Sequence, residues 1–526
     1  MKMENVNELL FNDNARSKLK EGIDLVCDAV KVTMGPQGRN VIINKINSAP
    51  HITKDGVTVA KEIFLKDRYR MMGANLIKGI ASKTCDDVGD GTSTSTLFAQ
   101  SIINGGYKKV KINHKNPVEI KSGLEKACKI IQEFIAKNAI KVASDNEMMK
   151  HVATISANND LFLGEIIATA VAKVGEFGAV TVDRSNNSDT ILDVINGFRI
   201  AKRGYLSPYF ITNESKQECI MEDVIIYLTD QRLTKASDAI NILNVAAKEK
   251  CSVLIIAEDV TEDALSTFVV NKIQNGMNVC CIKAPDFGQT RKDSLSDIAV
   301  LTGGKVFNVV DEGIFGFAKK VIIKKEDTLI IGATGEENLI KEKASILKGI
   351  STQNLTEFEK KIIEERLSRF SNSVASLKVG AKTEIELLEK IDRIDDALCA
   401  TRAAIEEGIV PGGGVVFLKA RKELLKHKQM FKGDELDGFD IIMDTLQAPI
   451  KQILINAGID YEEIIPQIEE NRKLFYGYNA KTYKYGNLLN QGVIDPAKVL
   501  RVALQNAVSI SSLFLTTECA IAPQYD

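Results

Sequence analysis

The chain has 526 residues, of which 44% are hydrophobic and 26% charged, and its 68 Lys and Arg nearly balance its 70 Asp and Glu. This composition is typical of a soluble globular protein with about three domains of roughly 150 residues each. The balanced charge gives no electrostatic reason to expect a nucleic-acid partner. No apolar stretch reaches the roughly 20 residues that span a bilayer, and the first residues resemble no secretory signal, so we expect no membrane partner and a cytoplasmic location.

Cysteine and histidine patterns argue against a metal centre that uses these residues. The nine cysteines include no CxxC pair, and most lie in apolar surroundings such as "DLVCDAV" and "NVCCIKA". Buried thiols in a reducing compartment are the simplest interpretation. The four histidines are scattered and form no HExxH motif, so we expect no metal held by imidazole or thiolate.

The first third of the sequence is predominantly helical in pattern. Apolar residues recur at helical spacing in "ARSKLKEGIDLVCDAVKVTM", and Gly35-Pro36 ends that segment. The segment "GRNVIINK" favours a strand, and Lys54-Asp55-Gly56 favours a turn. Helical patterns then continue to about residue 180.

The middle of the chain changes character. Short apolar runs at 223–230, 251–260 and 278–285 alternate with helical patterns at about 235–249 and 261–275. Strands that alternate with helices of this length predict a parallel α/β unit.

The last part returns to helices. Segment 319–333 predicts a hairpin, and Thr356 with Glu359 has the spacing of a capping box before a long charged helix. Helical patterns then dominate, interrupted by the glycine run "PGGGVV" at 411–416. The order helical, α/β, helical suggests a middle domain inserted between two outer halves.

The segment "GDGTSTST" at 89–96 combines an acid, two glycines and a run of hydroxyls at a predicted helix start. Unpaired N–H groups at a helix start carry partial positive charge, and glycine lets the backbone approach a ligand closely. The pattern therefore fits a phosphate site, with Asp90 as a candidate Mg²⁺ ligand. It is no Walker A loop, because no Gly-Lys-Ser/Thr follows.

An ordinary hydroxyl-rich helix cap explains the same local pattern equally well. Two further segments, "TMGPQG" at 33–38 and "TKDGVT" at 53–58, share its small, polar, glycine-containing style. Each of them alone would be a simple turn more often than a binding site. Together they favour the phosphate site.

Ten motifs in order carry a resemblance to a known family. They are "VKVTMGPQGRNV", "ITKDGVTVA", "GDGTSTST", "TISAN", "RGYLSPYF", "LIIAEDV", "KAPDFG", "DDALCATRAAIEEGIVPGGG", "YGYNA" and "DPAKV". With them the chain closely resembles the group I chaperonins, the GroEL type, over essentially its whole length.

The resemblance implies a multi-domain α plus α/β fold with three domains. The helical equatorial domain, which binds ATP, would comprise 1–137 and 410–526, and the intermediate domain 138–196 and 375–409. The α/β apical domain, which binds substrate and lid, would be 197–374. The family assembles into seven-membered rings, one or two, and folds non-native polypeptides in a ring cavity under a co-chaperonin lid.

The resemblance also implies the nucleotide site. Asp55 and Asp396 match the acids that position the attacking water, Asp90 matches the Mg²⁺ ligand, and Thr33, Lys54 and Ser93 match the surroundings of a monovalent cation, K⁺. Because Asp396 belongs to the intermediate segment, we expect it to reach the nucleotide only after that domain swings down. The implied ATP-binding residues are Thr33, Met34, Gly35, Pro36, Lys54, Asp90, Gly91, Thr92, Ser93, Thr94, Gly413, Asn479, Ala480, Lys481 and Asp495.

An apolar surface is implied in the apical domain. Periodicity alone would assign its residues to a core. In the family the matching positions bind non-native chains, because both partners remove apolar area from water. The implied polypeptide-binding residues are Tyr205, Tyr209, Phe210, Ile240, Leu243, Leu265, Phe268, Val269 and Val270.

The sequence departs from the family in several places. Ser93 stands where threonine is usual, which preserves the hydroxyl, and Asn372-Ser373 replaces a Gly-Gly hinge, which puts the range of apical rotation in doubt. The Gly-Met repeat tail of many members is not present in this sequence. Lys451 and Asp460 are candidate charged contacts between rings.

Three functional hypotheses follow. The leading one is an ATPase that couples hydrolysis to protein folding. The second is a holdase or scaffolding ring that binds clients without a productive ATP cycle. A small-molecule kinase that uses the phosphate loop is the weakest.

Overall fold

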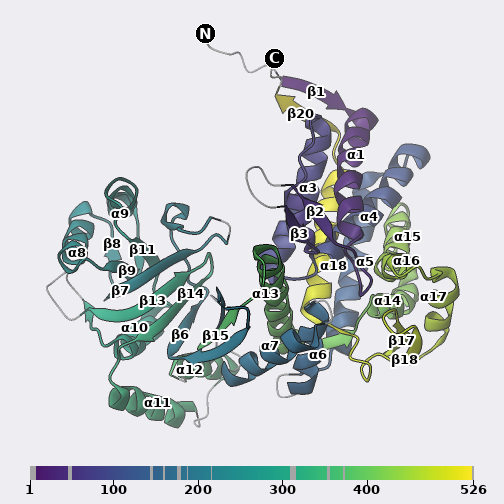
Figure 1. The fold of residues 1–526 in the computed structure, drawn as a ribbon. Helices are drawn as coiled ribbons and strands as arrows, with labels where there is room; N and C mark the ends of the chain where they lie inside the picture. The colour runs from purple at the N-terminus through teal and green to yellow at the C-terminus, as the bar shows by residue number, and fades with distance from the viewer. Residues whose placement is uncertain are drawn as a thin grey trace. The chain divides into compact units, whose positions relative to one another are not determined.

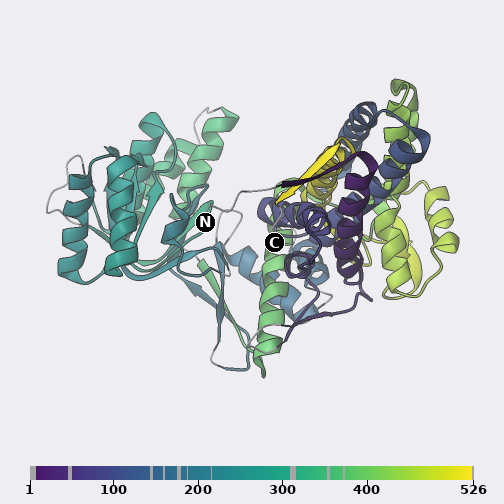
Figure 2. The same cartoon turned by 90° about the horizontal axis from the view of Figure 1, so that it is seen from above.

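The computed structural model describes residues 7–44, 50–142, 146–157, 160–174, 179–185, 187–214, 216–307, 315–351, 356–370 and 374–523. The chain forms two compact units, one of residues 1–169, 184–190 and 379–526, and one of residues 170–183 and 191–378. The inserted middle part therefore exists as a unit of its own, shown in teal in Figures 1 and 2. The finer division into three domains stays a prediction, and Asn372-Ser373 lies outside the described residues.

A bundle of long helices from both ends of the chain forms the centre of the first unit (Figure 1). Ile23, Ile77 and Ile102, from three of these helices, are fully buried in one hydrophobic core. Strands β1 (Asn7–Phe11) and β20 (Cys519–Pro523) pair antiparallel and join the two ends. The helices are α1 (Asn12–Lys31), α3 (Arg68–Val88), α4 (Thr92–Asn113), α5 (Pro117–Asn138) and α18 (Ala497–Leu515).

Shorter elements complete the first unit. Its remaining helices are α2 (Gly56–Lys61), α6 (Asn146–Ser156), α13 (Glu384–Glu407), α14 (Val415–Lys426), η2 (Lys428–Met430), α15 (Glu435–Thr445), α16 (Ala448–Asn456) and α17 (Tyr461–Glu470), and α7 (Leu161–Val174) contains residues of both units. Its strand pairs are β2 (Val41–Ile43) with β3 (His51–Thr53), β16 (Ile409–Pro411) with β19 (Ile494–Pro496), and β17 (Tyr476–Asn479) with β18 (Lys484–Asn487).

The predicted early elements are largely confirmed. The first helix is α1, and the strand predicted in "GRNVIINK" is the shorter β2. The turn predicted at Lys54-Asp55-Gly56 is wrong in one respect, because Asp55 is the N-cap of helix α2. The side chain of Asp55 accepts hydrogen bonds from the backbone N–H groups of the first turn, which starts a helix where the sequence suggested a turn alone.

A mixed seven-stranded sheet forms the centre of the second unit. Its order is β11-β9-β7-β13-β14-β6, with β12 beside β7. The parallel part predicted at 223–285 is confirmed, because β7, β9 and β11 run parallel, and the predicted hairpin is the antiparallel pair β13–β14. The strands are β6 (Gly197–Ala201), β7 (Cys219–Thr229), β9 (Ser252–Ala257), β11 (Val279–Lys283), β12 (Val306–Phe307), β13 (Gly316–Ile323) and β14 (Asp327–Ala333).

Helices and smaller strand groups surround this sheet. The predicted helices at 235–249 and 261–275 are α8 and α9, which pack against each other. The helical elements are η1 (Pro208–Phe210), α8 (Ala236–Glu249), α9 (Glu262–Asn275), α10 (Gly288–Thr302), α11 (Glu337–Ser351) and α12 (Glu357–Arg369). The remaining strands are β4 (Ala179–Arg184), β5 (Ile191–Ile195) and β15 (Val374–Val379), which form one sheet, and the pair β8 (Arg232–Leu233) and β10 (Asp259–Val260).

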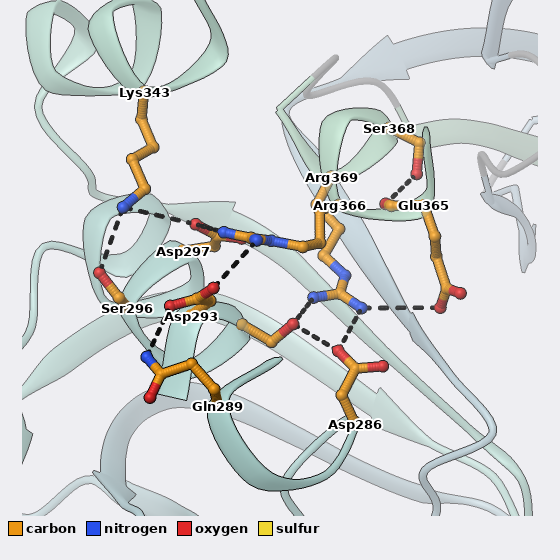
Figure 3. A network of polar contacts seen from close by, with 11 residues as sticks. Asp286, Gln289, Asp293, Ser296, Asp297, Lys343, Glu365, Arg366, Ser368 and Arg369 are labelled. Carbon is orange, nitrogen blue, oxygen red and sulfur yellow. Dashed lines mark hydrogen bonds and ion pairs between the residues drawn. The ribbon is translucent and has the colours of Figure 1, made fainter. Parts of the chain in front are cut away.

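Buried ion pairs hold the charged helix α12 against α10 (Figure 3). Asp297 is fully buried, and its carboxylate accepts hydrogen bonds from Nε and Nη2 of Arg366 at 2.6 and 3.1 Å. Next to this pair, Arg369 donates to Ser294 at 3.1 Å, and Lys343 of α11 lies 3.8 Å from Asp297. A bidentate pair of this kind fixes the angle between two helices as well as their distance.

None of the helices in the described part of the chain combines the length and apolar character needed to cross a membrane.

Candidate nucleotide site

A cavity of about 520 Å³ lies in the first unit. All of the predicted ATP-binding residues line it, together with both predicted catalytic acids, Asp55 and Asp396. The N-terminal ends of α2, α4 and α14 contribute to its wall, so several sets of helix N–H groups lie around one space. Segments that are far apart in the sequence thus form a single site.

Two glycines allow the predicted phosphate-binding segments to lie close together. Gly91 has φ of +79° and caps α4, a conformation that side chains resist. A Cβ on Gly56 would lie only 2.4 Å from Ser93 Oγ and 2.9 Å from Thr92 Oγ1. Glycine therefore brings the start of α2 against the start of α4.

The hydroxyl run divides into two groups. Thr92, Ser93 and Thr94 line the cavity, and Ser93 Oγ lies 3.3 Å from Thr33 Oγ1. Ser95 and Thr96 instead donate to carbonyl oxygens of their own helix, at 2.8 and 2.9 Å. The hydroxyls of the second group are therefore occupied within the helix, whereas those of Thr92, Ser93 and Thr94 lie at the cavity.

The carboxyl group of Asp90 is placed at the cavity by its own loop and by α6. It accepts hydrogen bonds from the backbone N–H of Gly91 and from Ser156 Oγ, the latter at 3.1 Å. Burial raises the pKa of Asp90 despite these hydrogen bonds, and the charge of Asp55 adds to the rise.

Asp396 lies on α13 and lines the same cavity. Burial raises the pKa of Asp396 well above its ordinary value, and the charges of Asp55 and Asp90 raise it further. The expectation that Asp396 stays away from the site until a domain swings down is wrong for this structure. Helix α13 belongs to the same compact unit as the phosphate loop and already brings the side chain there.

Asp495 lies in β19, which pairs with β16 just before the glycine run, so Asp495 and Gly413 are neighbours. Burial raises the pKa of Asp495 to about 7, with a further contribution from the charge of Asp90 and an opposing hydrogen bond from the Gly413 backbone. This carboxyl group changes its charge close to neutral pH.

These acids fit a metal–phosphate ligand better than a bare metal ion. The described residues include no ion pair to Asp55, Asp90, Asp396 or Asp495, and no cluster of three or more His, Cys, Asp or Glu side chains arranged to hold a metal. Mg²⁺ usually takes one or two carboxylates and completes its shell with phosphate oxygens and water. The Mg²⁺ ion of a magnesium nucleotide would place positive charge beside these acids.

Several cavity residues were missed by the sequence analysis. Ser156 lies within the quoted motif "TISAN", where its hydroxyl was the available signal. His151 and Gln491 also line the cavity, and nothing in their local sequence indicates this.

The predicted apolar surface of the second unit is only partly exposed. Phe210, Leu243 and Phe268 are buried in the core of this unit, so their placement on the surface was wrong. They occupy the inward faces of η1, α8 and α9, where removal from water stabilises the unit itself. Exposed fractions are 66% for Tyr209 and about half for Ile240 and Val270.

The other predicted surface residues lie between these extremes. Tyr205, Leu265 and Val269 are partly buried and pack against the core. Ile273, which the sequence analysis did not select, is 61% exposed and lies three residues after Val270 on α9. Because residues three apart share a helix face, Ile273 and Val270 expose apolar side chains on the same face of α9.

Comparison with solved structures identifies the fold class of this chain. The chain is similar to the chaperonin gp146 from bacteriophage EL 2 (Pseudomonas aeruginosa), crystallised in the presence of ATP-BeFx. Crystal form II matches with TM-score 0.73 and 21% identity, and form I with TM-score 0.65 and 20% identity. Each match covers 98% of this chain and 99% of gp146. The fold is therefore a chaperonin fold.

A sequence comparison identifies the family to which the chain belongs. The profile of the TCP-1/cpn60 chaperonin family matches residues 26–524. The chain belongs to the TCP-1/cpn60 chaperonin family, which confirms the resemblance found in the sequence and supports a chaperone role in protein folding.

Proposed function

We propose that this protein is an ATP-dependent chaperonin that binds non-native polypeptides on its second unit and promotes their folding inside a ring. One observation carries the proposal: every residue selected for ATP binding or hydrolysis lines one cavity of about 520 Å³. That volume is within the usual range of about 300–1,000 Å³ for small-molecule sites.

In this proposal the residues of the cavity divide the chemistry between them. Thr92, Ser93 and Thr94, with the N–H groups of α4, bind the phosphates. Asp90 would hold Mg²⁺ together with phosphate oxygens, and the bound metal would supply neutralisation of the phosphate charge. Asp55 and Asp396 orient water, and Asp495 contacts the sugar. K⁺ would lie near Thr33 and Ser93.

The electrostatics support such a ligand. Desolvation raises the pKa of Asp90, Asp396 and Asp495, and the charges of neighbouring acids raise it further. A bound cation would oppose this rise. The related fold of gp146, crystallised with ATP-BeFx, supports the nucleotide as well.

The client surface in this proposal is the exposed apolar strip, defined here as Tyr209, Ile240, Val270 and Ile273. Such side chains bind non-native segments because about 25 cal/mol is gained per Å² of apolar area removed from water. Hydrolysis then alternates states in which the strip is available to clients or covered by a lid. The ring of seven subunits, the lid and the cytoplasmic location are parts of the proposal taken from the family.

The test combines three measurements on the purified chain. Native mass gives the assembly, ATP turnover gives the enzymatic activity, and recovery of a chemically denatured enzyme with a co-chaperonin gives the folding activity. We expect a ring, Mg²⁺-dependent turnover and recovery. A monomer without turnover would refute the proposal, and client capture that ATP never releases would favour the holdase alternative.

A further inference from the structure

A histidine and an acid join two segments of the first unit outside the nucleotide cavity. His51 lies in β3 and Asp392 lies in α13, and both elements belong to this unit. The Nε2 atom of His51 is 3.5 Å from Oδ2 of Asp392. Neither residue lines the cavity, so any effect of this contact on a bound nucleotide would be indirect.

The sequence positions of the pair relate it to the two acids that are proposed to orient water. Asp55 follows His51 by four residues, and Asp396 follows Asp392 by four residues within α13. Residues four apart lie on one face of a helix, so Asp392 and Asp396 share a face of α13. The contact therefore joins the two segments close to the points where each one reaches the cavity.

The two ends of α13 are held differently. Its buried residues begin at Ile391, whereas residues 384–390 are exposed or half-buried. Near the other end, Glu407 forms an ion pair with Arg501 of α18 at 2.6 Å. The contact with β3 thus lies where the packed part of the helix begins, one turn before Asp396.

The surroundings of the pair strengthen its electrostatic attraction. Only 18% of the His51 side chain and 34% of the Asp392 side chain are exposed. His51 Nε2 itself is buried and makes no hydrogen bond within the described residues. With a proton on Nε2, the ring directs an N–H at the carboxylate whether the imidazole is neutral or charged. Partial burial makes this attraction larger than it would be in open water.

We propose that His51 is a positioning residue for ATP hydrolysis, because its contact with Asp392 holds α13 so that the Asp396 carboxyl group stays at the cavity. The inference rests on the proposed function, since it assigns a residue that supports an acid proposed to orient water. A misplacement of about 1 Å at a reacting centre can lower a rate about 100-fold, so a contact one helical turn away is sufficient to matter.

The experiment separates the rate of hydrolysis from the binding of nucleotide. Single-turnover hydrolysis of Mg²⁺-ATP measures the rate, and isothermal titration calorimetry with Mg²⁺-ADP measures the affinity. We expect His51→Ala to lower the single-turnover rate about tenfold and to leave the affinity at the wild-type value, because His51 acts on Asp396 and not on the nucleotide. His51→Gln, whose NH₂ group can still donate to Asp392, should recover most of the lost rate.

A second histidine provides the matched control. His427 Nε2 lies 3.7 Å from Glu423 of α14, and neither residue lines the cavity. His427→Ala therefore removes a contact of the same kind from the same unit. We expect this variant to keep the wild-type rate and affinity.

A double-mutant cycle tests whether His51 acts through Asp392. Whatever Asp392→Ala does alone, adding His51→Ala to it should change the rate little, because the histidine then has no carboxylate to contact. A loss from His51→Ala that is equally large with and without Asp392 would overturn the proposal.

The remaining outcomes distinguish the inference from the proposed function. If the wild type neither binds nor hydrolyses ATP, both fail. If the wild type hydrolyses ATP and His51→Ala does so at the same rate, or loses affinity as much as rate, the positioning role is overturned while the ATPase activity stands. His51→Asn, whose amide is too short to reach Asp392, gives the same test if the alanine variant does not fold.

Discussion

Acids with desolvated carboxyl groups occur in both units of this protein, in opposite electrostatic settings. In the second unit, Asp297 is fully buried but paired bidentately with Arg366 (Figure 3). In the first unit, the carboxyl groups of Asp90, Asp396 and Asp495 share a cavity, and their pKa values are raised by burial and by the charges of neighbouring acids. Loss of one partner from a buried ion pair is strongly destabilising, whereas an unpaired group of acids costs stability until a cation binds.

The largest expected effect is on ATP turnover and concerns Asp396, an acid proposed to orient water for hydrolysis. We expect Asp396→Asn to lower ATP turnover about 100-fold or more, because a neutral amide cannot orient and activate water as a carboxylate does. Nucleotide should still bind, since Mg²⁺ and the phosphates have other partners. Turnover under single-turnover conditions and calorimetric binding measure the two steps.

The neighbouring Asp395→Asn is the control for this change. Asp395 lies on the same helix but does not line the cavity, so turnover should stay near the wild-type value. Equal losses in both variants would contradict the role assigned to Asp396.

The paired acid predicts a large effect on stability instead. Arg366→Ala leaves Asp297 buried without its partner, and we expect about 3–5 kcal/mol of destabilisation around α10 and α12. Native-state hydrogen exchange in the intact protein can measure this locally. Lys341→Ala, which breaks the exposed pair Lys341–Glu337, should leave stability close to the wild-type value.

A double substitution tests whether the stability lost in Arg366→Ala comes from the unpaired charge of Asp297. Asp297→Leu with Arg366→Met removes both charges and should recover a large part of the loss, because no buried charge is left unpaired. If the double variant were as unstable as Arg366→Ala, the loss would come from packing and the comparison with the cavity acids would fail.

The unpaired acids predict a dependence on pH. Asp495 has a pKa of about 7 in the fold against an ordinary value of 3.8. Between these values the folded protein holds a proton that the unfolded chain has released, so the free energy of unfolding falls as pH rises from about 4 to 7. Asp495→Asn should remove this decline.

We expect Asp495→Asn to stabilise the nucleotide-free protein above pH 7 by about 1–2 kcal/mol, allowing for water in the cavity, and to have no effect below pH 4. Thermal unfolding across this pH range, with and without Mg²⁺-ATP, measures it. Stabilisation that is independent of pH would count against a titrating Asp495.

Some features of the cavity and of the buried ion pair could be predicted from the sequence, and others could not. The candidate phosphate-binding end could be predicted from the sequence, because Gly91, Thr92 and Asp90 are contiguous and their chemistry is local. Gln491 was not predicted, because it comes to line the cavity only when the β17–β18 hairpin and the glycine run meet in the folded chain. Likewise no local pattern pairs Asp297 with Arg366, which lie 69 residues apart.

Surface exposure was the hardest property to predict. Phe210, Leu243 and Phe268 have the same apolar character as Tyr209, Ile240 and Val270, yet the first three are buried and the last three exposed. Periodicity places residues on a helix face, but which face meets the sheet is decided by tertiary packing.

The capping box at the start of α12 stabilises the same helix that carries Arg366. Its removal is expected to reduce stability less than the loss of the buried pair. Thr356 Oγ1 accepts the N–H of Glu359, and the Glu359 carboxylate accepts the Thr356 N–H at 2.9 Å, as the sequence spacing predicted. Thr356→Ala should therefore cost about 1 kcal/mol, seen as faster hydrogen exchange in the first turn of α12. Because Arg366 lies in the last turns of the same helix, exchange there should stay slow in Thr356→Ala and become fast in Arg366→Ala. Uniformly faster exchange along α12 in Thr356→Ala would mean that the cap, and not the buried pair, holds this helix in place.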